Sequence, residues 1–174
     1  MKSGGVIGLG GIGGGVAQCL QRSGQLAGLY DVRAEAAANV PGAPPMASSP
    51  REVAQAADCE LLAVLDGPQT ISVLSGPDGV LAAGKRGQTV ILLSTISMGD
   101  LATAQNLCTD AGVILIDCGV TNGPKSAENG LEGQQGSRHG GRAHGAYPGL
   151  DAGCHQAANG FRPATGRKFE VSPG

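Results

Sequence analysis

Residues 6–13 of this chain read Val-Ile-Gly-Leu-Gly-Gly-Ile-Gly, a short apolar run that continues into the spacing Gly-x-Gly-x-x-Gly. A helix-compatible segment follows at 16–20, and a second apolar run at 26–30 ends in Asp31. A strand, a glycine turn, a helix, a strand and an acidic residue in this order are typical of units that bind dinucleotides. The alternative is a glycine-rich turn that binds nothing, and the flanking elements favour the binding site.

Each glycine of the pattern has a separate physical task. Gly8 permits the tight turn from strand to helix, Gly10 lets the backbone approach a pyrophosphate, and Gly13 allows the helix to pack closely on the strand. The first N–H groups of the helix then face the phosphates. Two further glycines, Gly14 and Gly15, each cost about 1 kcal/mol of helix propensity relative to alanine, so this helix should be loose at its phosphate end.

Asp31 is placed to accept hydrogen bonds from the ribose hydroxyls, which favours NAD over NADP. Arg33, two residues later, leaves NADP open because a guanidinium pairs well with a 2′-phosphate. The residues predicted to contact the cofactor in this first half are Gly8, Leu9, Gly10, Gly11, Ile12, Gly13, Asp31, Val32 and Arg33.

Apolar runs alternate with helix-compatible segments through the first 130 or so residues, which predicts βαβ units and a parallel sheet. The expected strands are 5–9, 26–30, 60–65, 89–93 and 113–117, with a weak one near 45–47. The expected helices are 12–23, 33–39, 50–57, 68–74 and 98–111. We therefore predict an α/β fold, a Rossmann-type doubly wound and mostly parallel sheet, with an NAD(P)-binding domain over residues 1–132.

Composition excludes several classes of function. A net charge of −2 and the absence of Trp give no basis for nucleic-acid binding. The longest aliphatic runs are far too short to span a bilayer, so no membrane partner is predicted. The five cysteines have neither Cys-x-x-Cys nor zinc-ligand spacing, so we predict no metal site and a reducing, cytoplasmic compartment.

The character of the chain changes after Glu132. Residues 133–174 are rich in Gly, Arg, Ala and His and poor in large hydrophobic residues, so a disordered or poorly packed tail is expected. The histidines and arginines there suggest metal or phosphate binding as an alternative, but their irregular spacing favours solvated coil. The composition is also that of a GC-rich gene read in a shifted frame, and we therefore expect a frameshifted or truncated product.

Three motifs in order give the chain a resemblance to the β-hydroxyacid dehydrogenase family. The family's opening Gly-Leu-Gly-x-Met-Gly-x-x-x-Ala-x-x-Leu resembles 8–20, and its Ser-Thr-(Ile/Val)-Ser-Pro turn resembles 94–98, with methionine in place of proline. Its Asp-Ala-Pro-Val-Ser-Gly-Gly loop resembles 117–123, followed by Ala127 and Gly130-Leu131. The family includes 3-hydroxyisobutyrate dehydrogenase, and its nucleotide domain is similar to that of 6-phosphogluconate dehydrogenase.

The resemblance implies roles for residues in the second half of the domain. Ser94 and Thr95 would border the nicotinamide, and Leu65 would contact the cofactor. Thr121, Asn122 and Gly123 would bind a small hydroxyacid. Both segments follow strands and should emerge at the carboxyl edge of the sheet, where ligands bind in open α/β folds. The alternative is ordinary turn chemistry, because Ser, Thr, Asn and Gly all form turns and caps.

Departures from the family pattern put catalysis in question. Thr121 stands where the family usually has serine, and Asn122 replaces a glycine. The family's Gly-x-Gly-x-x-x-Lys-x-x-x-Asn helix, which carries its catalytic lysine, does not occur in these 174 residues. Lys168 lies outside any apolar helical pattern, and Lys125 is interpreted as a solvated loop lysine. No catalytic residue is assigned.

Two functions remain open at this stage. The first is an NAD(P)-dependent oxidoreductase that transfers hydride between the nicotinamide and a small 3-hydroxy acid. The second is a catalytically incomplete dinucleotide-binding fragment, without the helical domain and the lysine. An imine-reducing relative is not excluded. The family-type dimer is not expected without the helical domain.

Overall fold

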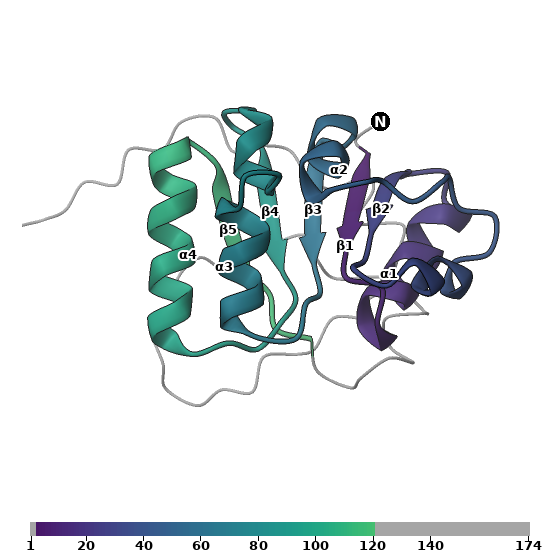
Figure 1. Cartoon of the computed structure of the whole chain (residues 1–174), viewed down its shortest axis with the longest axis horizontal. Coiled ribbons are helices and arrows are strands. Elements are labelled where there is room, and N and C mark those ends of the chain that lie inside the picture. The colour runs from purple at the N-terminus through teal and green to yellow at the C-terminus, as the bar shows by residue number, and fades with distance from the viewer. Residues whose placement is uncertain (1–2, 121–174) are drawn as a thin grey trace, which may run out of the picture.

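A five-stranded, all-parallel sheet forms the centre of the molecule. The computed structural model describes residues 3–120, and the strands lie in the order β2-β1-β3-β4-β5 (Figure 1). The strands are β1 (Gly4–Ile7), β2 (Leu26–Tyr30), β3 (Cys59–Leu62), β4 (Thr89–Leu92) and β5 (Ile114–Asp117). The pairing of β1 with both β2 and β3 places the first strand inside the sheet, as a doubly wound fold requires. The predicted fold class is confirmed.

Helices cover both faces of this sheet. They are α1 (Gly11–Arg22), α2 (Pro50–Ala56), α3 (Gly67–Ser75) and α4 (Met98–Ala111), with 3-10 helices η1 (Ala34–Asn39) and η2 (Val80–Ala83). Side chains from α2, α3, α4 and η2 form one apolar cluster against the sheet, and α1 and η1 form the other. Figure 1 shows α3 and α4 packed side by side, with α1 near β1 and β2.

Side-chain caps start three of the helices. Ser49, Asp66 and Ser97 each accept a hydrogen bond from a backbone N–H in the first turn of α2, α3 and α4, respectively. Pro50 opens α2 at a position where its missing N–H costs nothing. Helix α1 differs, because its N-cap is Gly10 and has no side-chain hydrogen bond.

Two local predictions need correction, and one short element was not predicted. Residues 45–47 do not form a strand, because Pro44 and Pro45 have no N–H to donate; Ala47 alone bonds to the carbonyl of Leu29, at 2.9 Å. The segment 33–39 forms the 3-10 helix η1 instead of an α-helix. The 3-10 helix η2 lies between the predicted helix 68–74 and the predicted strand 89–93, where no element was expected.

None of the helices within residues 3–120 is long and apolar enough to cross a membrane. The predicted tail at 133–174 lies outside the described residues.

Candidate functional site: a pocket at the carboxyl edge of the sheet

A pocket of about 930 Å³ opens where β1, β2, β3 and β4 end. Its size is in the range of small-molecule and cofactor sites. Ten residues predicted to contact a cofactor line it: Gly8, Gly10, Gly11, Ile12, Asp31, Val32, Arg33, Leu65, Ser94 and Thr95. The parallel strands bring together segments that are up to 87 positions apart (Gly8 to Thr95), because all of them end at this edge.

The remaining two predicted residues, Leu9 and Gly13, lie behind the pocket wall. Leu9 is fully buried in the apolar cluster under α1. A Cβ at position 13 would collide with the carbonyl oxygen of Gly8, so only glycine permits this approach of α1 to the turn. Both residues shape the site from beneath.

The glycine turn is crowded by backbone at Gly8 and open toward the pocket at Gly10. Gly8 has a φ of 90°, and a Cβ there would lie 2.5 Å from the carbonyl oxygen of Ala63. Gly10 has a φ of −67°, and a Cβ there would meet no atom of the described residues 3–120 within 4 Å. The uncapped first turn of α1 thus faces a space in which an anionic group could accept its N–H hydrogen bonds.

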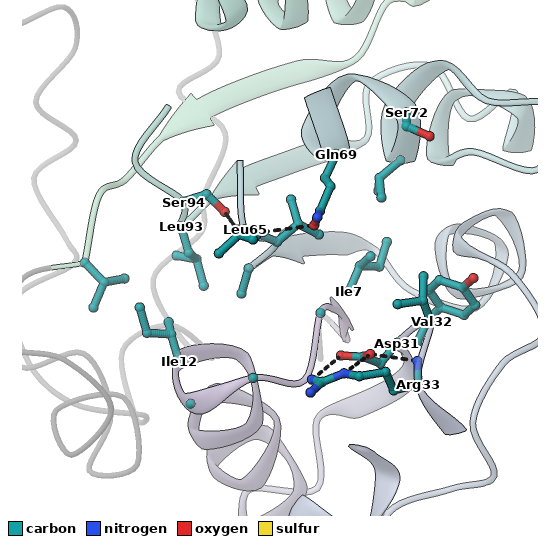
Figure 2. A pocket seen from close by; sticks show the side chains of 18 of the residues that line it. Ile7, Ile12, Asp31, Val32, Arg33, Leu65, Gln69, Ser72, Leu93 and Ser94 are labelled. Atoms are coloured by element: carbon teal, nitrogen blue, oxygen red, sulfur yellow. Dashed lines mark hydrogen bonds and ion pairs between the residues drawn. The ribbon is translucent and has the colours of Figure 1, made fainter. Parts of the chain in front are cut away.

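Asp31 and Arg33 lie together on one side of this space (Figure 2). The Asp31 carboxylate accepts a hydrogen bond from the backbone N–H of Leu9 at 2.7 Å and from that of Arg33 at 2.9 Å. It also pairs with the Arg33 guanidinium, whose Nε lies 3.2 Å from Oδ1. Burial raises the pKa of Asp31, but these hydrogen bonds outweigh burial and hold it below its ordinary value.

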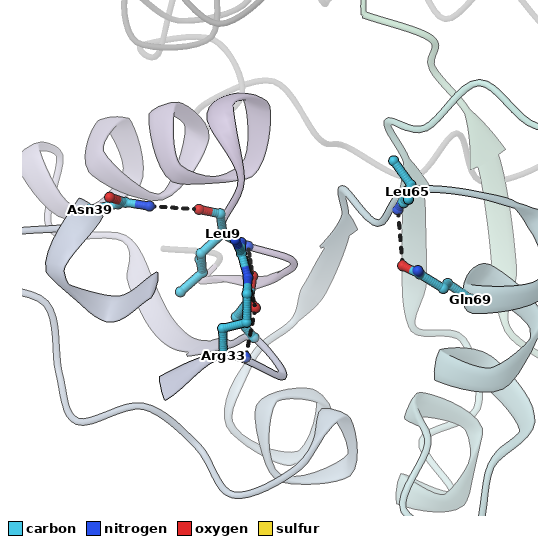
Figure 3. Close-up of polar contacts among 6 residues, drawn as sticks. Leu9, Arg33, Asn39, Leu65 and Gln69 are labelled. Carbon is cyan, nitrogen blue, oxygen red and sulfur yellow. Dashed lines mark hydrogen bonds and ion pairs between the residues drawn. The ribbon is translucent and has the colours of Figure 1, made fainter. Parts of the chain in front are cut away.

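Apolar and amide groups form the opposite wall. Gln69 of α3 accepts a hydrogen bond from the backbone N–H of Leu65 at 3.2 Å (Figures 2 and 3). Ser94 is buried and donates to the carbonyl of Val64 at 2.5 Å, whereas Thr95 is exposed. The Leu65 side chain remains 81% exposed, a large value for an aliphatic residue that lines a pocket.

Sequence reasoning missed several lining residues. They lie at or after the carboxyl ends of strands and in α3: Ile7, Tyr30, Ala63, Val64, Gln69, Ser72, Val73, Leu93 and Val120. Five of them fall within the predicted strands 5–9, 26–30, 60–65 and 89–93, and a place near the carboxyl end of a predicted strand is the signal that could have found them. Gln69 and Ser72 have no such signal, because only the packing of α3 brings them to the pocket.

The predicted substrate residues Thr121, Asn122 and Gly123 lie outside the described residues, as does Lys125. Within 3–120, His, Cys, Asp and Glu side chains do not gather in threes as a metal site requires.

The doubly wound sheet and the glycine turn at its carboxyl edge define a dinucleotide-binding domain of the Rossmann class. A family model described as the NAD binding domain of 6-phosphogluconate dehydrogenase matches residues 3–134, and the chain belongs to this family. This membership confirms the predicted resemblance and the prediction of an NAD-binding domain.

Individual relatives carry dehydrogenase names. L-threonate dehydrogenase of Cupriavidus necator is 35% identical over 129 residues, which are 72% of this chain and 43% of that enzyme. Mitochondrial 3-hydroxyisobutyrate dehydrogenase of Mus musculus is 32% identical over 130 residues, 72% of this chain and 38% of that enzyme. Among solved structures, 3-hydroxyisobutyrate dehydrogenase of Mycobacterium tuberculosis with L-serine matches with a TM-score of 0.68 and 25% identity, over 74% of this chain and 43% of that one.

The chain therefore spans about two fifths of the length of the relatives that it matches. The family model's match, residues 3–134, includes all the residues that line the pocket described above.

Proposed function

We propose that the chain binds a dinucleotide in this pocket, and that residues 1–132 are the cofactor domain of an NAD(P)-dependent 3-hydroxyacid dehydrogenase. The observation that carries the proposal is the first turn of α1, which has no side-chain cap and faces the open space beside Gly10. The pyrophosphate would accept hydrogen bonds from these N–H groups. When bound, the nicotinamide would supply or accept the hydride of the reaction.

The remaining wall would hold the two ends of the cofactor. Val32 is 85% exposed and Leu65 is 81% exposed, and their side chains would cover an adenine ring that enters the pocket. Asp31 would accept hydrogen bonds from the ribose hydroxyls, so NAD is preferred to NADP. Ser94 and Thr95 would lie beside the nicotinamide.

We further propose that Thr121, Asn122 and Gly123 hold a small hydroxyacid, and that these 174 residues alone turn over little of it. Oxidation of an alcohol needs a group that takes the hydroxyl proton. Residues 1–132 contain no histidine, and the family's lysine motif does not occur in the sequence. A catalytically incomplete, cofactor-binding chain is the form of the function that these residues support best.

A substitution at Gly10 tests the binding site without disturbing the fold. In Gly10→Ala the new methyl group has space in the unliganded chain but occupies the volume proposed for the pyrophosphate. Calorimetric titration should show NAD binding weakened by about tenfold or more, with the melting temperature unchanged. Gly99→Ala is the matched control, because its Cβ would meet only Ser97 Oγ, at 3.8 Å, within 4 Å.

Two outcomes would contradict the proposal. If the wild-type chain bound neither NAD nor NADP, dinucleotide binding would be refuted. If Gly10→Ala bound NAD with unchanged affinity, the pyrophosphate would not bind beside Gly10. Rapid NAD reduction by the 174-residue chain with short 3-hydroxyacids would refute catalytic incompleteness, and Lys125 would then be the first proton acceptor to examine.

A further inference from the structure

The peptide groups around Leu9 are held by side chains from the second βα segment (Figure 3). Leu9 lies between Gly8 and Gly10, and its side chain is fully buried. Its backbone N–H donates to Asp31 Oδ2 at 2.7 Å. Two glycines flank this residue, so the backbone has wide freedom here unless something outside the turn restricts it.

Asn39 holds the other side of Leu9. Its side-chain Nδ2 donates to the Leu9 carbonyl oxygen at 3.1 Å. Asn39 is the last residue of η1, and its own carbonyl accepts a hydrogen bond from Gln18 Nε2 of α1 at 2.7 Å. Asn39 is therefore fixed to α1 while its amide reaches the turn in front of that helix.

Gly14 provides the room for this contact. A Cβ at position 14 would lie 3.3 Å from the Leu9 carbonyl oxygen and 3.6 Å from Asn39 Cβ. The first of these distances is tighter than most Cβ contacts, so a side chain at 14 would press on the carbonyl that Asn39 binds. This gives a physical reason for a glycine that lowers the propensity of α1 to be helical.

We propose that Asn39 is a positioning residue for phosphate binding. Together with Asp31 it fixes both peptide groups of Leu9, and so sets the direction in which the N–H groups of residues 10–13 face the pocket. A turn that already has its binding conformation loses less entropy when an anion binds. The inference rests on the proposed dinucleotide site and adds to it a residue that never touches the ligand.

The test compares a probe that has a pyrophosphate with one that has none. ADP and adenosine are titrated into the full 174-residue chain, followed by nuclear magnetic resonance, for wild type and Asn39→Ala. We expect Asn39→Ala to weaken ADP binding about fivefold, the effect of one hydrogen bond, and to change adenosine binding by less than about twofold. A merely structural role would weaken both probes equally.

Gln21→Ala is the matched control. Gln21 Nε2 donates to the Gly42 carbonyl at 2.5 Å, so the variant also loses an amide-to-carbonyl bond between α1 and the segment after η1. It should leave ADP affinity within about twofold of wild type. Equal ADP losses in the two variants, or no loss in Asn39→Ala, would overturn the inference.

Hydrogen exchange of the unliganded chain separates this inference from the proposed function. The Leu9 amide is hydrogen-bonded to Asp31, so Asn39→Ala should speed its exchange at least about threefold and leave the amides of β3 unchanged. If wild type binds no ADP, the proposed function fails and Asn39 has no phosphate to position. If wild type binds ADP but exchange at Leu9 does not change in the variant, the inference alone fails.

Discussion

Asp31 at the carboxyl end of the sheet and Glu60 near its amino end are both almost completely buried, with 8% and 0% of their surface exposed. The surroundings of the two carboxyl groups differ in their hydrogen-bond donors. Asp31 receives three donors, namely the N–H groups of Leu9 and Arg33 and the Arg33 guanidinium. Glu60 receives one side-chain donor at Oε1, and within residues 3–120 its Oε2 has no hydrogen-bond partner.

This difference gives the two groups opposite titration behaviour. Donors and a cation hold the pKa of Asp31 below its ordinary value, so the group is ionised at neutral pH. Burial raises the pKa of Glu60 to about 8, against the attraction of Lys85, so the group is mostly protonated there. Burial raises the pKa of both groups, and it is deeper at Glu60; at Asp31 the donors and the Arg33 cation outweigh it.

The neighbours of Glu60 explain why Lys85 does not neutralise it. Gln88 Nε2 lies 2.6 Å from Glu60 Oε1 and also donates to the carbonyl of Ala54 at 2.8 Å. The Lys85 ammonium donates to the carbonyls of Gln55 and Ala57, at 2.6 and 3.1 Å. Both donors thus bind the last carbonyls of α2, where a helix has orphan acceptors. At the amino edge of the sheet, the donors Lys85 and Gln88 therefore cap the carboxyl end of α2.

The largest expected effect is at Glu60. Because its pKa is about 8 in the folded chain and 4.5 is its ordinary value, the folded state keeps a proton that the unfolded state loses between these values. The free energy of unfolding should therefore fall by about 1.4 kcal/mol per pH unit across this window and level off above it. Glu60→Gln should remove most of this slope in chemical denaturation from pH 5 to pH 9. Glu35→Gln, which changes an exposed acid, should keep it; an unchanged slope in Glu60→Gln would show that Glu60 titrates normally.

Asp31→Asn tests the other half of the comparison, with an effect of about 1–3 kcal/mol at pH 7. The variant keeps one carbonyl acceptor for the N–H of Leu9 but loses the ion pair with Arg33. The pKa of Asp31 is lowered, so its contribution is present above the unfolded pKa and is lost as the pH falls through the folded pKa. Denaturation at pH 7 and pH 3 should show the variant less sensitive to acid than wild type. Asp78→Asn, an exposed control, should match wild type; equal behaviour of the two variants would contradict the comparison.

The features that depend on residues close together in the sequence could be predicted from short sequence patterns. The glycine turn, all five strands and the place of Asp31 just after β2 were predicted correctly, because strand, turn and helix signals act over a few positions. The order of these elements then implies one edge of the sheet for the site. Leu9 and Gly13 were included as members of the motif, although they support the pocket from behind.

Tertiary contacts decided what the sequence could not show. Asn39 ends a short 3-10 helix, and nothing in its neighbourhood indicates that its amide reaches a carbonyl 30 positions earlier. Glu60 lies in a run of buried strand residues, where its charge state depends on Gln88 and Lys85 from a different loop. The strand predicted at 45–47 failed because proline removed the donors that a ladder needs.

The smallest expected effect, and the sharpest test of the donor argument, is at Arg33. Its side chain is 58% exposed, so Arg33→Ala should change the stability of the chain little. The variant removes the guanidinium donor and cation but keeps the backbone N–H groups of Leu9 and Arg33 on the Asp31 carboxylate. The pKa of Asp31 should therefore rise part of the way toward its ordinary value, as measured by the pH dependence of its carboxyl carbon resonance.

Arg86→Ala is the control. It removes an exposed guanidinium just before β4, at the amino edge of the sheet, and should leave the pKa of Asp31 unchanged. If Arg33→Ala also left it unchanged, backbone donors alone would account for the ionised state of Asp31, and Arg33 would be free to pair with a 2′-phosphate, in which case NADP would bind as well as NAD.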